Sequence, residues 1–229
     1  MKYTKDKEIN EILNYLHDIA NNNTREWFHA NRGRYDDVRE KFEEIVRGLL
    51  VRIGQFDSSV THLDVKDCIY RFYRDVRFSQ DKSPYKRHFG CYINARGRKA
   101  LRGGYYFHLQ PNENMIAAGT WYLPSNILRE VRYSILEDID GFRSIVERPE
   151  FREAFPQLGY DSLKTMPKGF PKDFAYPEYV RIKIYSCFNN LDNSYFDHRD
   201  WLDDMAHKFE VGKPFVDFIN DTIDDYAEE

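Results

Sequence analysis

Residues 89–121, "FGCYINARGRKALRGGYYFHLQPNENMIAAGTW", decide the fold class because they contain three successive rows of alternating side chains. The alternating members are Phe89, Cys91, Ile93 and Ala95, then Tyr105, Phe107 and Leu109, then Met115, Ala117, Gly119 and Trp121. A period of two is typical of half-buried β-strands. The basic loop "RGRKALRGG" joins the first two rows. The stretch therefore predicts an antiparallel meander.

Helical patterns flank this meander on both sides. Apolar residues recur at helical spacing over 9–20, Thr24 is expected to cap a short second helix, and a third is expected to end at Gly54. After the meander the pattern predicts helices from Ser125 and Asp140, a connecting loop over 156–178, and one more strand in "VRIKIYSCF", residues 180–188. Two acidic helices are expected to close the chain, with a helix start at Gly212 and Pro214 in its first turn.

These patterns together predict an α+β fold. We expect an antiparallel sheet of about five strands, flanked by N-terminal and C-terminal helices. At 229 residues the chain is expected to form a single domain over residues 1–229.

Composition points to a globular protein with an aromatic core. The chain is 41% hydrophobic and 31% charged, and its 17 Tyr, 17 Phe and 3 Trp supply much of the apolar surface. No apolar run is long enough to cross a bilayer and no signal peptide is visible, so we expect a cytoplasmic protein without a membrane partner. Cys68, Cys91 and Cys187 are expected to lie in strands as buried, unpaired thiols.

The net charge of −4 conceals two opposite regions. Residues 66–102 contain eleven Lys or Arg against three Asp, whereas residues 192–229 contain three Lys or Arg against twelve acidic residues. Two such fields on one chain indicate either an anion-binding middle or two surfaces that neutralise each other.

The basic region centres on "RFYRDVRFSQDKSPYKRHFG", residues 71–90. Residues 68–78 fit both a helix and a strand, and their aromatic and β-branched content favours the strand. In a strand Arg74 is the one charge on the apolar face, and its guanidinium suits a carboxylate or a phosphate. Pro84 makes residues 79–86 a turn. The remaining charged and aromatic candidates of this segment are Arg77, Asp81, Lys82, Tyr85 and Lys86.

Two interpretations of this segment stay open. Arg74 and Arg77 either line an anion site or form an internal ion-pair network with Asp75, Asp81 or the acidic C-terminal helices. A nucleic-acid surface at the loop bearing Arg96, Arg98, Lys99 and Arg102 is less favoured, because the pI near 6.0 is far from a basic footprint.

Other residues could contribute chemistry to such a site. His108 could act as a general base, with Asp81 as a second catalytic candidate, although a hydrogen-bonded sheet histidine is the commoner arrangement. Lys164 and Lys168 could close over an anion from their loop. The acidic segment "FDHRDWLDD" matches no known metal spacing, so no metal is predicted. No cofactor is predicted either, because the chain has no nucleotide-binding fingerprint.

Several long motifs resemble one known family. "RFYRDVRFSQDKSPYKRHFG" resembles its Arg-Asp-x-Arg-Phe-x-x-Asp-Lys-x-Pro-Tyr-Lys signature, and "NNNTREWFHANRGRY", "YYFHLQPNENMIAAGTWYLP" and "LKTMPKGF" resemble three further blocks. The chain is thereby identified as a member of the microbial family named domain of unknown function 2461, over its full length. The resemblance implies no established reaction. Where the family pattern has a run of glycines, this chain has Ala117, Ala118 and Gly119.

The sequence therefore leads to a functional hypothesis about binding. We expect an enzyme or binding protein for a small phosphorylated or carboxylated compound, with Arg74, Arg77, Lys82, Tyr85, Lys86, Lys164 and Lys168 as ligand-binding candidates. The alternatives are a protein-interaction module that uses the acidic C-terminal helices, and a binder of nucleic acid or another anionic polymer. The patterns decide neither the reaction nor the oligomeric state.

Overall fold

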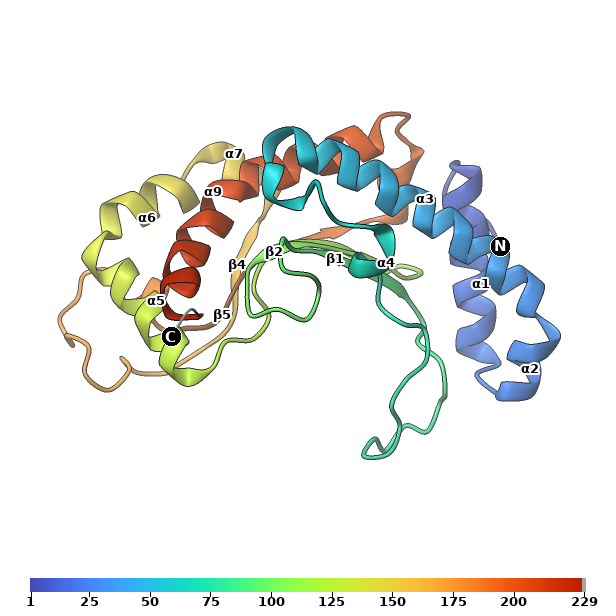
Figure 1. The fold of residues 1–229 in the computed structure, drawn as a ribbon, viewed down its shortest axis with the longest axis horizontal. Coiled ribbons are helices and arrows are strands. Elements are labelled where there is room, and N and C mark those ends of the chain that lie inside the picture. The colour runs from blue at the N-terminus through green and yellow to red at the C-terminus, as the bar shows by residue number, and fades with distance from the viewer. Residues whose placement is uncertain (228–229) are drawn as a thin grey trace. The chain divides into compact units, whose positions relative to one another are not determined.

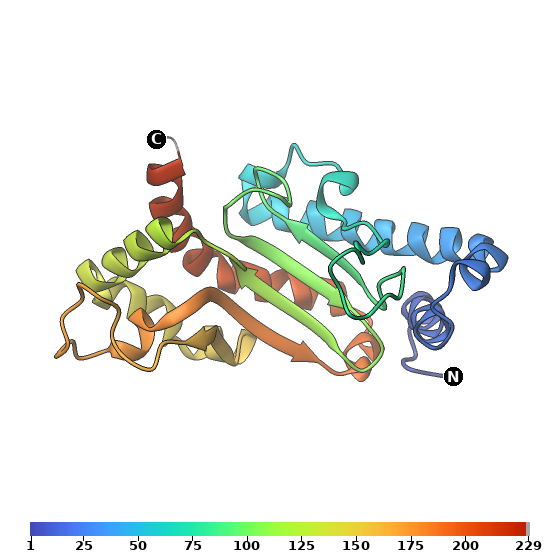
Figure 2. The ribbon, with the colours of Figure 1, turned by 90° about the horizontal axis from the view of Figure 1, so that it is seen from below.

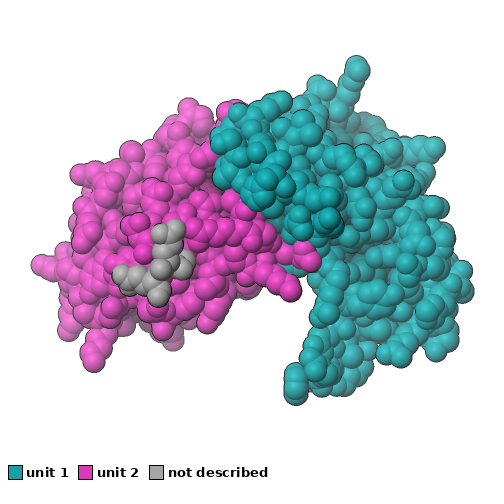
Figure 3. Space-filling view, in the orientation of Figure 1, with its two compact units in different colours: residues 1–93, 106–116, 190–206 teal, residues 94–105, 117–189, 207–229 magenta. Residues whose placement is uncertain are grey.

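The computed structural model describes residues 1–227. The chain divides into two compact units, which interleave along the sequence (Figure 3). Unit 1 comprises residues 1–93, 106–116 and 190–206, and unit 2 comprises residues 94–105, 117–189 and 207–229. That residues 1–229 form one domain stays a prediction.

A five-stranded antiparallel sheet confirms the predicted α+β class (Figures 1 and 2). Its strand order is β1-β2-β3-β5-β4. The strands are β1 (Phe89–Ile93), β2 (Gly104–Leu109), β3 (Asn114–Gly119), β4 (Gln157–Ser162) and β5 (Ile182–Leu191). The first three are the meander that the alternating rows predict.

Unit 1 contains the N-terminal helices α1 (Lys7–Asn21), α2 (Arg25–Ala30), α3 (Arg32–Phe56) and α4 (Val65–Cys68), and two 3-10 turns, η1 (Ser58–Val60) and η2 (Asn193–Asp197). Thr24 caps α2 as predicted, since its hydroxyl accepts a hydrogen bond from the Trp27 amide at 3.2 Å. Phe42 of α3 stacks on Phe89 and Phe107, so α3 covers one face of β1 and β2. The alternate residues of these strands therefore lie on the opposite face.

Unit 2 contains β4 and most of the remaining helices. These are α5 (Ser125–Glu137), α6 (Ile139–Val146), α7 (Pro149–Ala154) and α8 (Pro177–Val180), and the greater part of α9 (Trp201–Ala227). Strand β3 ends at Gly119, whose φ of 120° is a conformation that side chains rarely adopt. A Cβ at this position would lie 2.4 Å from the carbonyl oxygen of Tyr185, so the close approach of the two strands here requires glycine.

The predicted strand over residues 68–78 is wrong. Asp64 and Asp67 form a capping box that starts α4, so Cys68 ends a helix. Beyond it, only isolated bridges join Ile69 to Cys91 and Tyr73 to Tyr85. The physical reason is Pro84, which lies opposite this segment and has no N–H with which to extend a ladder.

Two predictions for the C-terminal half are also wrong. The expected loop over 156–178 contains β4, whose exposed sequence "QLGYDS" lacks alternation and whose pairing with β5 shifts between Leu158 and Tyr160. The two expected C-terminal helices are one helix, and Gly212 is not a helix start. Pro214 lies inside α9, and the buried stripe of Phe209, Phe215 and Ile219 continues on both sides of it. Burial of this stripe offsets the roughly 3 kcal/mol that proline costs within a helix.

All three cysteines are buried and none forms a disulfide, as predicted, but only Cys91 and Cys187 lie in strands, because Cys68 ends α4. Burial raises the pKa of the Cys91 and Cys187 thiols above the ordinary value, which keeps both protonated. Over residues 1–227, none of the helices is both long and apolar enough to span a membrane.

Candidate functional site

The basic signature segment folds into a narrow ribbon in unit 1. The Arg74 amide donates to the carbonyl of Pro84 at 2.9 Å, and the Lys86 amide donates to the carbonyl of Phe72 at 2.9 Å. We call residues 73–85, which lie between the bridged tyrosines, the Arg74 turn.

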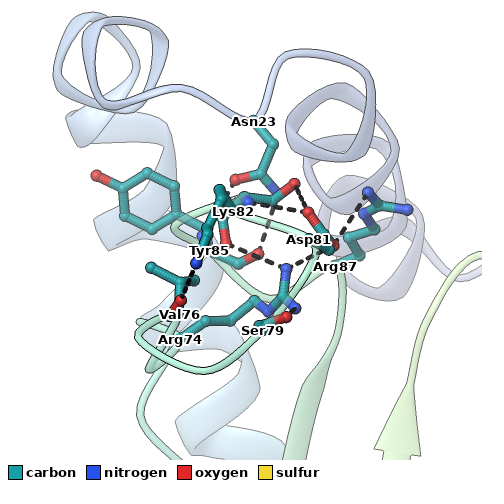
Figure 4. A network of polar contacts seen from close by, with 9 residues as sticks. Asn23, Arg74, Val76, Ser79, Asp81, Lys82, Tyr85 and Arg87 are labelled. Carbon is teal, nitrogen blue, oxygen red and sulfur yellow. Dashed lines mark hydrogen bonds and ion pairs between the residues drawn. The ribbon is translucent and has the colours of Figure 1, made fainter.

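The guanidinium of Arg74 holds this turn together from inside (Figure 4). It pairs with the Asp81 carboxylate at 2.6 Å and donates to the Ser83 carbonyl at 3.1 Å and the Ser79 hydroxyl at 3.3 Å. Asp81 also accepts hydrogen bonds from the hydroxyl and the amide of Ser83. Ser83 first, and Arg74 second, hold the pKa of Asp81 well below its usual range. Arg74 and Asp81 thus satisfy each other within the turn.

Two further cations of the turn also have local partners. Arg77 forms a fork with Asp75, with nitrogen–oxygen distances of 3.0 and 2.7 Å. The ammonium of Lys82 donates to the Val76 carbonyl at 3.0 Å. At the tip of the turn, Phe78 is 97% exposed.

Tyr85 fixes the base of the turn to the helices of unit 1. Its ring is 2% exposed and stacks on Phe28, with centroids 4.1 Å apart and planes 17° apart. The Asn23 side chain accepts from the Tyr85 amide at 3.1 Å and donates to the Tyr85 carbonyl at 3.0 Å (Figure 4). This amide clamp is the structural role of an asparagine in "NNNTREWF". It joins two sequence motifs, because Asn23 and Tyr85 are 62 positions apart in the chain.

Lys86, immediately after the turn, is in a different environment. It is half-buried, and its ammonium lies 5.0 Å from the ring centroid of Tyr70. Burial lowers its pKa below the ordinary lysine value, and the charge of Arg71 lowers it further. Among residues 1–227, no carboxylate forms an ion pair with the side chain of Lys86 or with that of Arg71.

Two histidines lie next to Lys86 on the sheet face opposite α3. The rings of His88 and His108 have centroids 4.3 Å apart and planes 32° apart. Burial lowers the pKa of His88 to about 3, and His108 and Lys86 add to this shift. Burial also lowers the pKa of His108. Both imidazoles are therefore neutral at pH 7.

A chain of hydrogen bonds runs from β2 into the β2–β3 turn. The Tyr106 hydroxyl lies 2.9 Å from Nδ1 of His108, and Nε2 of His108 lies 3.3 Å from Oε1 of Gln110. The Gln110 amide nitrogen donates to Glu113 at 2.6 Å. Burial raises the pKa of Tyr106 above the usual phenol range. We call Tyr70, Lys86, His88, Tyr106 and His108 the sheet-face cluster.

A family model for conserved hypothetical proteins, DUF2461, matches residues 11–218. The chain belongs to the DUF2461 family. Neither the curated proteins nor the solved structures include a match to the chain.

Most of the site residues that the sequence predicts lie either in the Arg74 turn or in the sheet-face cluster. Arg74, Arg77, Asp81 and Lys82 lie in the Arg74 turn with internal partners, and Tyr85 lies in the core beneath it. Lys86 and His108 lie in the sheet-face cluster. Lys164 and Lys168 are exposed in the loop between β4 and α8 of unit 2. That these residues bind a ligand stays a prediction.

Sequence reasoning missed three members of the cluster: Tyr70, His88 and Tyr106. The signal was present in the alternation, because His88 shares a row with Gly90, and Tyr106 shares one with His108. These rows are the polar sides of strands whose apolar sides form the core.

The two charged regions partly neutralise each other within unit 2. Asp224 of α9 pairs with Arg96 at 3.2 Å and with Arg102 at 3.0 Å. Two arginines of the loop that is the alternative nucleic-acid surface are therefore in ion pairs with Asp224. In residues 1–227, no group of three or more His, Cys, Asp or Glu side chains is arranged to hold a metal ion.

Proposed function

We propose that this DUF2461 protein binds a small anionic compound, phosphorylated or carboxylated, at the sheet-face cluster of unit 1. The observation that carries the proposal is Lys86, a half-buried cation with no carboxylate partner among the described residues. Removal of an ammonium from water is unfavourable unless a counter-charge replaces the lost hydration. An anionic ligand would supply that counter-charge.

The surroundings of Lys86 support the same proposal. Arg71 adds a second cation close enough to lower the pKa of Lys86. His88 is neutral and can donate or accept a hydrogen bond without adding charge, whereas the two ring nitrogens of neutral His108 already face Tyr106 and Gln110. The cluster also lies on the sheet face that α3 leaves uncovered, and its side chains are half-buried rather than sealed.

The Arg74 turn supports the site in a different role. Its internal ion pairs make it a closed, self-satisfied unit, and its base is fixed by the Tyr85–Phe28 stack and the Asn23 clamp. A fixed base positions Lys86, which is the next residue along the chain. We therefore propose Lys86 as the ligand contact and Arg74 as a residue that shapes the turn. Both ring nitrogens of His108 bond to Tyr106 and Gln110, so His108 orients Tyr106 within the cluster.

Thermal melts with added anions test the proposal. Phosphate should raise the melting temperature of the wild type by binding the folded state, and Lys86→Met should lose that increment. Phosphate also stabilises proteins generally through exclusion from their surface, so the decisive quantity is the difference between wild type and variant. Lys172→Met, at an exposed lysine of unit 2, is the matched control and should respond as the wild type does.

The free protein provides an independent readout. Lys86→Met replaces a half-buried cation, which has no ion-pair partner within the described part of the chain, with an apolar side chain of similar length. The variant should therefore be at least as stable as the wild type without anions. Equal responses of wild type and Lys86→Met to phosphate, sulfate and citrate would overturn the proposal.

A further inference from the structure

The hydrogen-bond chain of the sheet-face cluster has a direction that its last member sets. The Glu113 carboxylate can only accept, so the Gln110 amide turns its nitrogen toward Glu113. The carbonyl oxygen of the same amide then faces Nε2 of His108. Because this oxygen can only accept, Nε2 carries the proton.

The direction continues through the imidazole to Tyr106. A neutral imidazole with its proton on Nε2 has a lone pair on Nδ1. The Tyr106 hydroxyl, 2.9 Å away, therefore donates its proton to Nδ1. The phenolic oxygen has only lone pairs left for any other partner.

The local backbone conformation positions the residues of this hydrogen-bond chain. Asn112 adopts a left-handed conformation with φ of 64°, and the Glu113 amide donates to the Gln110 carbonyl at 3.1 Å, which brings Glu113 back to Gln110. On β1, Gly90 lies beneath the Tyr106 hydroxyl. A Cβ at Gly90 would lie 3.1 Å from that oxygen, so a side chain at this position would crowd the Tyr106 hydroxyl.

We infer that the anion bound by this cluster also carries a hydrogen-bond donor, a hydroxyl or amine group, which the oxygen of Tyr106 accepts. The inference rests on the proposed function and specifies its ligand. Lys86 offers donors for the anionic group, whereas Tyr106 offers an acceptor. Both flank Tyr70, whose ring centroid lies 6.4 Å from that of Tyr106 and 5.0 Å from the Lys86 ammonium. Hydroxycarboxylates and phosphate monoesters with a neighbouring hydroxyl have this pattern.

Matched ligand pairs test the inference by calorimetry. Glycolate is compared with acetate, and glycerol 1-phosphate with propyl phosphate, so that each pair differs in hydroxyl groups. The wild type should prefer the hydroxylated member by about tenfold or more, because a site built around a hydrogen bond discriminates against a ligand that lacks it. Tyr106→Phe should bind both members about equally, within about twofold, while it keeps the wild-type affinity for acetate and propyl phosphate.

Two controls separate this role of Tyr106 from a structural one. Tyr73→Phe, at a partly exposed tyrosine of the Arg74 turn, should keep the wild-type preference. Gln110→Leu, which removes the acceptor for Nε2, should weaken the preference without abolishing anion binding. In the free wild type, nitrogen-15 spectra should show His108 with its proton on Nε2.

The outcomes distinguish the inference from the function on which it rests. Anion binding with no preference for the hydroxylated ligand would overturn the inference and leave the proposed function intact. A proton on Nδ1 of His108, or an unchanged preference in Tyr106→Phe, would also overturn it. Absence of any anion binding would overturn the proposed function and this inference together.

Discussion

Asn23→Ala should loosen the Arg74 turn from the helices of unit 1. The substitution removes two hydrogen bonds to the Tyr85 backbone, of 3.0 and 3.1 Å, at a residue that is 2% exposed. Each such bond contributes a net of about 1 kcal/mol to stability. Water cannot easily replace the Asn23 side chain at the Tyr85 amide and carbonyl, so the unfolding free energy should fall by about 2 kcal/mol. Asn23→Asp should be at least as damaging at pH 7, because a carboxylate would face the Tyr85 carbonyl.

Hydrogen exchange and urea unfolding measure the two consequences. The amides of Arg74 and Lys86, which bond across the ribbon, should exchange faster in Asn23→Ala. The urea midpoint should fall with an unchanged slope. Asn21→Ala is the control, since its side chain is exposed and bonds only within α1, and its effect should stay within about 0.5 kcal/mol.

The reasoning would be refuted if Asn23→Ala matched Asn21→Ala in stability and left exchange at Arg74 and Lys86 unchanged. The amide clamp would then be a consequence of packing rather than its support. A functional readout follows from the same variant: because Lys86 follows the clamped residue, anion affinity should fall together with exchange protection.

Three further predictions concern other parts of the chain. Arg132 is buried, its Nε has no hydrogen-bond partner among residues 1–227, and its guanidinium bonds to the Ile182 carbonyl and to Tyr185. Arg132→Met should therefore change the unfolding free energy measured in urea by no more than about 1 kcal/mol, whereas Arg132→Ala should lose about 2 kcal/mol or more through a cavity. The pKa of His88 is lowered to about 3 from an ordinary 6.5, so the folded state resists protonation and loses stability as pH falls from 6.5 toward 3. The unfolding free energy of His88→Gln should fall less steeply than that of the wild type over this pH range. Equal slopes of unfolding free energy against pH would contradict the prediction. Gly119→Ala should cost about 3 kcal/mol or more, measured by thermal unfolding, and a loss below about 1 kcal/mol would contradict the proposed backbone strain.

The sequence was sufficient where one physical signal dominated. The alternation over 89–121 predicted the meander, and the apolar period over 9–20 predicted α1, because burial of one face sets both patterns. The same reasoning failed for β4, which has no buried face to produce alternation, and for α9, where local proline and glycine signals were outweighed by a continuous buried stripe.

The sequence indicates which segment concentrates the charged residues, but not how those residues pair. Charge and residue type drew attention to Arg74, yet they could not show that Asp81 and two serines satisfy it within the turn. Nor could they show that Lys86, twelve positions later, has no acidic partner among residues 1–227. Pairing depends on the path of the turn, which Pro84 and the bridge from Tyr73 to Tyr85 determine.

The burial of Cys68, Cys91 and Cys187 has a practical consequence for experiments on this protein. None of these thiols offers a reactive, solvent-facing sulfur, since burial also keeps Cys91 and Cys187 protonated. Phe78→Cys, at the 97% exposed tip of the Arg74 turn, would therefore create a single addressable attachment point. A fluorophore or spin label placed there would report the motion of the turn directly, without first removing any native cysteine.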